Sequence, residues 1–242
     1  MANFYINKDA INENTATITG DEAKHISKVL RMKKGDSVVL CDGEGHFYDA
    51  VLSSFTETSV TADILSFRNA ETEPEVKITI YQGVPKNPKL ETIVQKATEV
   101  GVCTIVPVDT VRAVAKIDKE AKIDRLRKIA AEAAKQSKRG IIPEVKSVMT
   151  FKKAAEEAKN ADIALIPYEE ETEVSLKEAL RGKKAETIAI MIGPEGGFEK
   201  SEVEYAKSLG IQSVTLGKRI LRTETAGLCV STAVLYEMDE MR

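Results

Sequence analysis

Two glycine-rich segments near the end of the chain have the residue types and spacing of a ligand-binding site. Residues 193–198 read Gly-Pro-Glu-Gly-Gly-Phe and directly follow the apolar run 188–192. Residues 216–221 read Leu-Gly-Lys-Arg-Ile-Leu and begin at the last residue of the short run 213–216. Glycine has no Cβ, so a ligand can approach the backbone closely, and it tolerates positive φ. We call these segments the first and the second glycine turn; each predicts a buried strand that opens into a helix.

The two turns predict one shared pocket, because the carboxyl ends of parallel strands meet at the same edge of a sheet. A phosphate-binding P-loop is excluded, since Phe198, Glu199 and Lys200 occupy the positions that require Gly-Lys-Ser/Thr. The dinucleotide fingerprint Gly-x-Gly-x-x-Gly is also absent. A purely structural role for the glycines is the alternative, and two dense, charged turns so close together favour a binding site over it.

The elements that must position these turns alternate between strand and helix from Val76 onward. Such alternation predicts an α/β domain with a parallel sheet and helices on both faces. The predicted strands are 76–82, 103–108, 163–166, 188–192 and 213–216, and the predicted helices are 90–100, 119–138, 151–159, 175–180, 200–209 and 222–238.

The first seventy or so residues have a different pattern. Short β-type runs at 38–40, 47–52 and 59–65 surround one short helix at 21–31, and a hairpin signal lies between the first two runs. Many short strands in so few residues predict a small β-barrel. The polar stretch 69–74, closed by proline, predicts a boundary that divides the chain into domains 1–72 and 73–242.

Composition fits a soluble cytoplasmic protein. The net charge is −3, with 43% hydrophobic and 30% charged residues. No apolar run approaches the ~18 residues that span a bilayer, and the N-terminus has no signal-peptide pattern. Three widely spaced cysteines and two histidines are a poor set for disulfides or a metal site, so we expect neither a membrane segment nor a metal.

Basic residues are concentrated in residues 112–139, where ten Lys and Arg stand against four Asp and Glu. Within this segment Leu126, Ile129 and Ala130 have helical spacing and predict a buried face, which leaves Arg125 and Lys128 on the outside. Segregated charge of this kind attracts anions even on an acidic protein. An ordinary solvated helix face is the alternative.

Several motifs together resemble one known family. The first glycine turn with Ile192 and Glu202, and residues 216–226, carry the most specific part of the resemblance; residues 25–31, 95–102 and 132–137 agree with it in order. Over nearly its whole length the chain resembles the ribosomal RNA small subunit methyltransferase E (RsmE) family of the SPOUT superfamily. The resemblance implies methylation of uridine N3 in small-subunit ribosomal RNA, with S-adenosylmethionine as methyl donor. It also implies a PUA-like β-barrel, a SPOUT-type domain with a trefoil knot, and a homodimer that acts on ribosomal RNA or on the assembled small subunit.

The donor has an adenine that backbone groups in a dry slot can bind. We expect three loops to form this slot. The predicted donor-binding residues are Ile166, Pro167, Tyr168, Ile192, Gly193, Pro194, Glu195, Gly196, Gly197, Leu216, Gly217, Ile220 and Leu221.

Uridine N3 carries a proton and is a weak nucleophile until that proton leaves, so the acceptor needs a base or a stabilising cation. Arg222, Thr223 and Glu224 follow the second turn and are the predicted catalytic residues. Arg222 would stabilise uridine oxygens or a phosphate, and Glu224 would accept the proton. Helix capping is the alternative role for Thr223 and Glu224.

RNA phosphates need cations on the surface. The predicted RNA-binding residues are Lys24, His25, Lys28 and Arg31 in the first domain, and Lys86, Lys89, Lys96, Arg112, Arg125, Lys128 and Arg139 in the second. Two further hypotheses stay open at this point. The acceptor could be another base or a ribose 2′-hydroxyl, because one fold hosts several activities. The protein could also be a non-catalytic RNA-binding factor in ribosome assembly.

Overall fold

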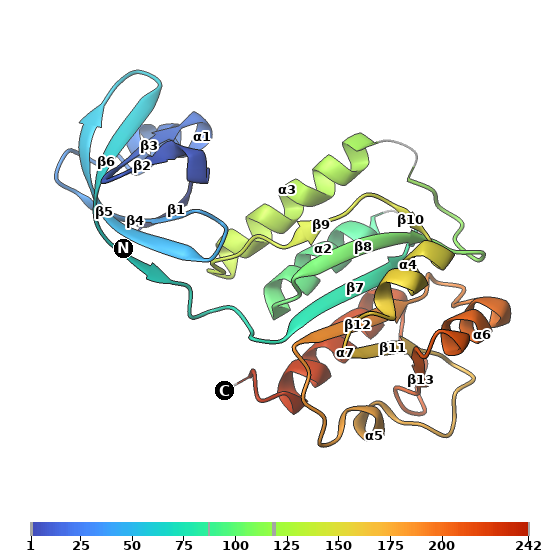
Figure 1. The fold of residues 1–242 in the computed structure, drawn as a ribbon. Helices are drawn as coiled ribbons and strands as arrows, with labels where there is room; N and C mark the ends of the chain where they lie inside the picture. The colour runs from blue at the N-terminus through green and yellow to red at the C-terminus, as the bar shows by residue number, and fades with distance from the viewer. Residues whose placement is uncertain (1, 87, 118–119, 242) are drawn as a thin grey trace. The chain divides into compact units, whose positions relative to one another are not determined.

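The alternating pattern in the second part of the chain folds into a parallel sheet (Figure 1). A computed structural model describes residues 2–86, 88–117 and 120–241. All strand pairs of this sheet are parallel, and their order is β10-β8-β7-β12-β11-β13, with β9 also paired to β8. The strands are β7 (Lys77–Gly83), β8 (Thr104–Asp109), β9 (Glu144–Val145), β10 (Met149–Thr150), β11 (Ile163–Pro167), β12 (Thr187–Ile192) and β13 (Gln212–Val214).

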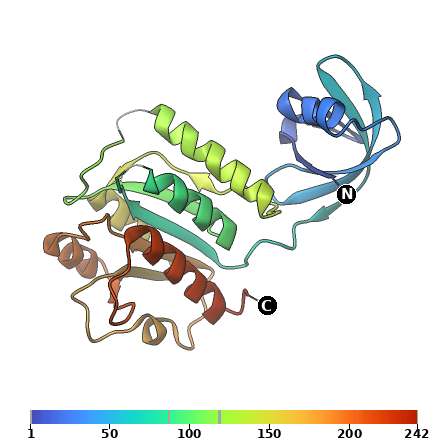
Figure 2. The same cartoon turned by 180° about the vertical axis from the view of Figure 1, so that it is seen from behind.

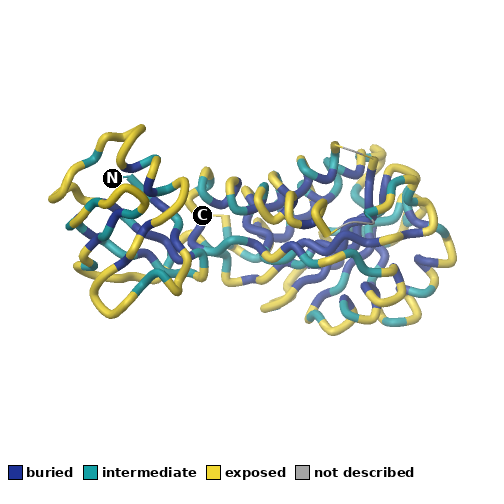
Figure 3. The backbone as a smooth tube through the Cα atoms, turned by 90° about the horizontal axis from the view of Figure 1, so that it is seen from above, coloured by how far each residue is buried: buried dark blue, intermediate teal, exposed yellow. Residues whose placement is uncertain are grey.

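Helices cover both faces of the sheet. One hydrophobic core contains side chains of α2, α3, α5 and α7, and Figure 2 shows α2, α3 and α7 lying across that face. A second core contains side chains of α4 and α6 on the opposite face. The central strands are therefore buried on both sides, as their continuous apolar sequence predicts (Figure 3). The helices are α2 (Lys89–Val100), α3 (Glu120–Gln136), α4 (Phe151–Ala158), α5 (Leu176–Leu180), α6 (Lys200–Ser208) and α7 (Thr223–Glu237).

Strand register brings the predicted site together. Leu165 of β11 pairs with Ile190 of β12, and Pro167 pairs with Val214 of β13. The three strands thus end at the same edge of the sheet. The loop after β11, the first glycine turn after β12 and the second glycine turn after β13 all begin there.

The first part of the chain forms a separate six-stranded sheet that curls around its own core. Its order is β1-β4-β5-β6-β3-β2, in which β1 pairs with β4 in parallel and the other pairs are antiparallel. The strands are β1 (Ala2–Tyr5), β2 (Ile11–Asn12), β3 (Thr15–Thr19), β4 (Ser37–Cys41), β5 (His46–Phe55) and β6 (Ser59–Asn69). A 3-10 turn, η1 (Lys8–Ala10), precedes β2, and the predicted short helix is α1 (Gly20–Lys24) followed by one π-helical segment, η2 (His25–Val29).

The chain divides into two compact units in a way that differs from the single predicted boundary. The first unit is Met1–Glu73 together with Ala134–Ile142, and the second is Pro74–Ala133 together with Pro143–Arg242. The end of α3 and the turn after it therefore belong to the first unit. Because Lys138 has a φ of 59°, the helix stops at Gln136, short of the predicted 138. The predicted start, Lys119, lies outside the described residues.

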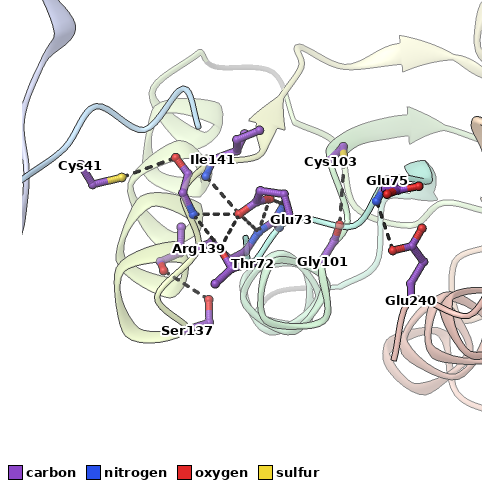
Figure 4. Close-up of polar contacts among 12 residues, drawn as sticks. Cys41, Thr72, Glu73, Glu75, Gly101, Cys103, Ser137, Arg139, Ile141 and Glu240 are labelled. Atoms are coloured by element: carbon purple, nitrogen blue, oxygen red, sulfur yellow. Dashed lines mark hydrogen bonds and ion pairs between the residues drawn. The ribbon is translucent and has the colours of Figure 1, made fainter. Parts of the chain in front are cut away.

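A buried ion pair explains why residues 134–142 belong to the first unit. Nη2 of Arg139 donates to Oε2 of Glu73 at 2.6 Å, and the N–H groups of Gly140 and Ile141 donate to Oε1 of the same carboxylate. Figure 4 shows Glu73 at the centre of these contacts, with Thr72 beside it. The hydroxyl of Tyr5 also bonds the main chain at Ala134 and Arg139. These partners are far apart in sequence, so no local pattern predicts them.

Candidate functional site

A cavity of about 690 Å³ lies at the carboxyl edge of the parallel sheet. Both glycine turns and the loop after β11 line it, together with the start of α7. Eleven of the thirteen predicted donor-binding residues are among its lining residues. They are Pro167, Tyr168, Ile192, Gly193, Pro194, Glu195, Gly197, Leu216, Gly217, Ile220 and Leu221.

Two predicted donor-binding residues do not line the cavity. Ile166 is fully buried, because its side chain points to the face of the sheet that α4 and α6 cover. Gly196 is turned toward Arg112, whose Nη1 donates to the Gly196 carbonyl at 3.0 Å. The structure thus places neither residue on the cavity wall.

The first glycine turn is held from inside by a buried polar network. The Thr223 hydroxyl donates to the Gly193 carbonyl at 2.6 Å and accepts from Nε2 of Gln82 at 2.8 Å. Gln82 is fully buried at the end of β7. A hydroxyl has one proton to donate, and here Gly193 receives it. Thr223 therefore braces the first glycine turn, and its direct catalytic role stays a prediction.

Close backbone packing holds the same turn from the side of β7. A Cβ built at Gly83 would lie 2.6 Å from Cδ of Pro194 and 2.7 Å from its nitrogen, so only glycine fits there. Behind the turn, the buried Glu202 carboxylate accepts from the N–H groups of Val111 and Glu199. Gln82 and Gly83 were not among the predicted site residues, although Gln82 ends the predicted strand 76–82 and Gly83 directly follows it.

A cluster of charges lies at the rim of the cavity. Nζ of Lys89 is 3.2 Å from Oε1 of Glu195 and 3.4 Å from Oε2 of Glu224. The N–H of Lys86 also donates to Glu195. Burial works to raise the pKa of the Glu195 carboxyl, but hydrogen bonds from its own N–H, from Lys89 and from the Lys86 N–H outweigh burial and lower it. Glu195 is thus held as a carboxylate.

The loop after β11 supplies a second strongly held carboxylate. The N–H of Glu173 lowers the pKa of the Glu171 carboxyl to about 2, with a further contribution from Lys207, whose Nζ is 3.2 Å away. The same loop reaches the second turn, because the Thr215 N–H donates to the Val174 carbonyl at 2.8 Å. Glu171 and Thr215 line the cavity and were not among the predicted residues.

The second glycine turn is open by comparison. The Ile220 side chain is 86% exposed, and Gly217 has a φ of 100°. Among the described residues, the N–H groups of 218–221 have no main-chain acceptor. Arg222 is also exposed, and no hydrogen bond or ion pair of its guanidinium occurs within the described part of the chain. These groups are available to a ligand.

The predicted RNA-binding residues have different environments. In the first unit, Lys28 and Arg31 are exposed, Lys24 pairs with Asp21, and the His25 ring packs edge-on against Phe4. In the second unit, Lys86 and Lys128 are exposed. The remaining cations there pair with carboxylates: Lys89 as above, Lys96 with Glu99, Arg112 with Glu199, and Arg125 with Glu91.

Arg139 requires a correction. It is only 3% exposed, because its guanidinium is enclosed in the ion pair with Glu73. A side chain in this state cannot reach an RNA phosphate, so Arg139 is a structural residue of the first unit.

Other kinds of site find no support in the described ranges. None of the described helices combines the length and the apolar character needed to cross a bilayer. Across the same ranges, no three His, Cys, Asp or Glu side chains gather in a way that could bind a metal ion.

Comparisons with known proteins agree on one family. The model of the RNA methyltransferase domain matches residues 72–235, and that of the RNA methyltransferase PUA domain matches residues 18–65. The chain is 37% identical to ribosomal RNA small subunit methyltransferase E of Bacillus subtilis, over 94% of this chain and 92% of the relative. It is 33% identical to the protein of that name from Mesomycoplasma hyopneumoniae, over 98% and 100%.

A solved structure agrees with the sequence relatives. The ribosomal RNA small subunit methyltransferase E from Neisseria gonorrhoeae, solved with S-adenosylmethionine bound, superimposes with a TM-score of 0.87 at 29% identity. The superposition covers 98% of this chain and 97% of that one. The similarity therefore includes both units and not only the parallel sheet.

Proposed function

Because the chain belongs to the ribosomal RNA small subunit methyltransferase E family, we propose that it methylates N3 of a uridine in small-subunit ribosomal RNA, with S-adenosylmethionine as donor. The observation that carries the proposal is the cavity that both glycine turns line. Family membership supports the rRNA methyltransferase activity, and the bound donor in the related structure supports the cofactor. The choice of uridine N3 comes from the family resemblance of the motifs.

The cavity fits the donor in size and in chemistry. Its volume of about 690 Å³ lies within the range of small-molecule sites. A Cβ built at Gly217 meets no atom within 4 Å, so the backbone there borders open space that a ligand can fill. Free N–H groups in the second turn can bind an adenine edge. In the first turn Gly193 packs closely on Gly197, since a Cβ at Gly193 would lie 3.0 Å from the Gly197 carbonyl carbon, and we assign ribose and the methionyl part to the cavity that both residues line.

S-adenosylmethionine supplies a methyl group on a sulfonium, which leaves as a neutral thioether when the methyl carbon bonds to N3. The N3 proton has to leave for this displacement, and we assign its acceptance to the Glu224 carboxylate at the start of α7. Arg222, exposed beside the cavity, stabilises the negative charge on the uridine oxygens with its fixed guanidinium. Thr223 keeps the first turn in place between them.

Three features of the family complete the proposal. The family resemblance of the motifs also implies a trefoil knot in the second unit and a homodimer. A cytoplasmic location follows from the proposed ribosomal substrate. Light scattering of the purified protein tests the dimer.

The proposed activity is tested by transfer of an isotopically labelled methyl group to free small-subunit ribosomal RNA and to assembled small subunits. Mass spectrometry then locates the modified nucleotide. We expect one N3-methylated uridine. Methylation of another base or of a ribose hydroxyl would replace the acceptor, and donor-dependent transfer to neither substrate would leave a non-catalytic RNA-binding role as the better account.

Arg222→Ala should separate catalysis from donor binding. Removal of one group that stabilises developing negative charge typically lowers kcat by about 10²–10³-fold, and we expect a loss of that order here. Donor affinity, measured by calorimetry, should stay close to that of the wild type. The control is Arg181→Ala, which removes an exposed arginine far from the cavity. Unchanged turnover of Arg222→Ala would refute its role.

Lys128→Glu should weaken RNA binding through charge alone. Lys128 is exposed on α3, and charges on a surface are screened within about 10 Å at 0.1 M salt. The loss of affinity should therefore be large at low ionic strength and small at high ionic strength. Filter binding at two salt concentrations measures it. Equal affinity of variant and wild type at low salt would remove this face of α3 from the RNA-binding surface.

A further inference from the structure

The ammonium group of Lys89 joins two carboxylates that come from different parts of the site. Lys89 is the first residue of α2, Glu195 lies in the first glycine turn, and Glu224 lies in the first turn of α7. The two N–O distances are 3.2 Å and 3.4 Å. The exposed fractions of the three side chains are 30%, 31% and 24%, so the cluster is partly shielded from water. We call it the Lys89 bridge.

The two carboxylates depend on Lys89 to different degrees. Glu195 has other donors, because the N–H of Lys86 also bonds both of its oxygens. Oε2 of Glu224 is shielded from solvent and has no hydrogen-bond partner among the described residues. The nearby charge of Lys89 is therefore the main compensation for a carboxylate oxygen that water cannot solvate.

Other charged groups near the cavity do not replace Lys89. Arg222 is exposed and unpaired within the described residues. Glu91, two residues after Lys89 on α2, pairs with Arg125. Lys207 pairs with Glu171 across the loop after β11. The remaining charged residues that line the cavity are Glu169 on that loop and Lys218 and Arg219 in the second turn, and all three are exposed.

We propose that Lys89 is a positioning residue for methyl transfer, which holds the Glu224 carboxylate in place at the start of α7 and ties it through Glu195 to the first glycine turn. The inference rests on the proposed function, in which Glu224 accepts the N3 proton. It also changes the sequence-based role of Lys89, because an ammonium held between two carboxylates is not a free phosphate contact.

Removal of the cation has a defined consequence. Without Lys89, two carboxylates share a partly shielded site with no cation between them, and like charges repel each other. Glu224 is the one expected to move, since Glu195 keeps the Lys86 N–H. A displaced Glu224 cannot accept the N3 proton of uridine, so the loss of Lys89 acts through the position of its neighbour.

Carbon-13 NMR of glutamate-labelled protein tests the bridge without donor or RNA. In Lys89→Met we expect the carboxyl signal of Glu224 to shift at neutral pH, because the ammonium beside it is gone. Lys89→Arg should keep the signal close to its wild-type position, because it keeps the cation. Lys184→Met removes an exposed lysine outside the site and is the matched control. An unchanged Glu224 signal in Lys89→Met would overturn the proposal.

Kinetics test whether the bridge serves methyl transfer. At neutral pH, Lys89→Met should lower kcat about tenfold or more while donor affinity changes little, and Lys89→Arg should recover much of the loss. In a Glu224→Gln background the Lys89→Met substitution should add no further loss. A loss that Lys89→Arg does not recover, or that adds fully to Glu224→Gln, would contradict the positioning role.

The proposed function and the role of Lys89 can be overturned separately. An inactive wild type would overturn the proposed function and with it the role of Lys89 in transfer. An active wild type whose Glu224 signal and kcat are unmoved by Lys89→Met would overturn the inference about Lys89 alone. Circular dichroism of Lys89→Arg and Lys89→Met confirms that both variants fold.

Discussion

The first glycine turn is fixed from several directions, whereas the second glycine turn borders open space. Thr223 donates to the Gly193 carbonyl, and Arg112 donates to the Gly196 carbonyl. The second turn has an almost fully exposed Ile220, and the N–H groups of 218–221 lack main-chain acceptors within the described residues. Both turns line the same cavity. We therefore expect the first turn to be preformed in the free protein and the second turn to become ordered when a ligand binds.

The difference assigns the turns different parts in binding. A prearranged wall contributes affinity without an ordering cost, whereas fixing the backbone of a loose segment costs roughly 1–2 kcal/mol per residue. The first turn is therefore suited to place the methyl group accurately. The second turn is suited to close over the adenine with its free N–H groups. Substitutions at each turn test whether the first turn is preformed and the second turn is ordered by the ligand.

Gly83→Ala should disrupt the fixed wall most strongly. The new Cβ would lie 2.6 Å from Cδ of Pro194, so the first turn has to move. Overpacking of this kind costs about 1–3 kcal/mol, and we expect donor affinity to fall roughly ten- to a hundredfold by calorimetry. If donor affinity is retained, the position of the first turn does not matter for binding and the contrast fails.

Gly227→Ala is the matched control for that substitution. Its Cβ would meet no atom closer than 3.7 Å, an ordinary contact, although Gly227 is also buried near Gln82. Donor affinity should not change. Because alanine is favoured over glycine within a helix, the free energy of unfolding should rise by about 0.5–1 kcal/mol.

Thr223→Val should weaken the first turn without touching the second. It leaves the buried amide of Gln82 and the Gly193 carbonyl short of a partner, which costs about 1–3 kcal/mol in the free energy of unfolding. Urea denaturation measures this loss. Thr223→Ser should keep most of the stability, and Thr225→Val, two residues along α7, should change it by no more than about 0.5 kcal/mol. A stable but inactive Thr223→Val would return Thr223 to a catalytic role.

Acid should destabilise the loop after β11, which contacts the segment leading into the second turn, because the Glu171 carboxylate stabilises that loop. The folded pKa of Glu171, about 2, lies below the ordinary glutamate value of 4.5. The ionised group therefore stabilises the fold above the ordinary value, and this contribution is lost as the pH falls toward 2. Urea midpoints of wild type and Glu171→Gln should differ most near neutral pH and converge in acid. Glu204→Gln, on an exposed part of α6, should show no such convergence; a difference independent of pH would contradict the assignment to Glu171.

The sequence predicts the parallel sheet well because its strands are continuous apolar runs. The predicted strand 188–192 is β12, Thr187–Ile192, and the predicted helix 222–238 is α7, Thr223–Glu237. The burial of these strands on both faces produces a pattern that is local in sequence. The first unit was harder, since β1 and β3 were not predicted and the parallel pairing of β1 with β4 joins distant segments.

The site was predicted in outline, and the errors have physical causes. Glycine turns mark where backbone is exposed, which is why most of the predicted donor-binding residues line the cavity. Ile166 does not line it, because the alternation of side chains along a strand sends it into the core. Arg139 was wrong because its partner, Glu73, is sixty-six positions away in sequence. The supporting residues Gln82, Gly83 and Glu171 act through contacts between separate elements, which no motif records.

Hydrogen exchange with and without S-adenosylmethionine distinguishes a preformed first turn from a second turn that the donor orders. The amides of the first glycine turn should exchange slowly in the free protein and change little on donor addition. The amides of 218–221 should exchange rapidly in the free protein and become strongly protected when the donor binds. Protection that appears elsewhere in the chain, or a first turn that is as fast as the second before binding and gains as much, would contradict the account.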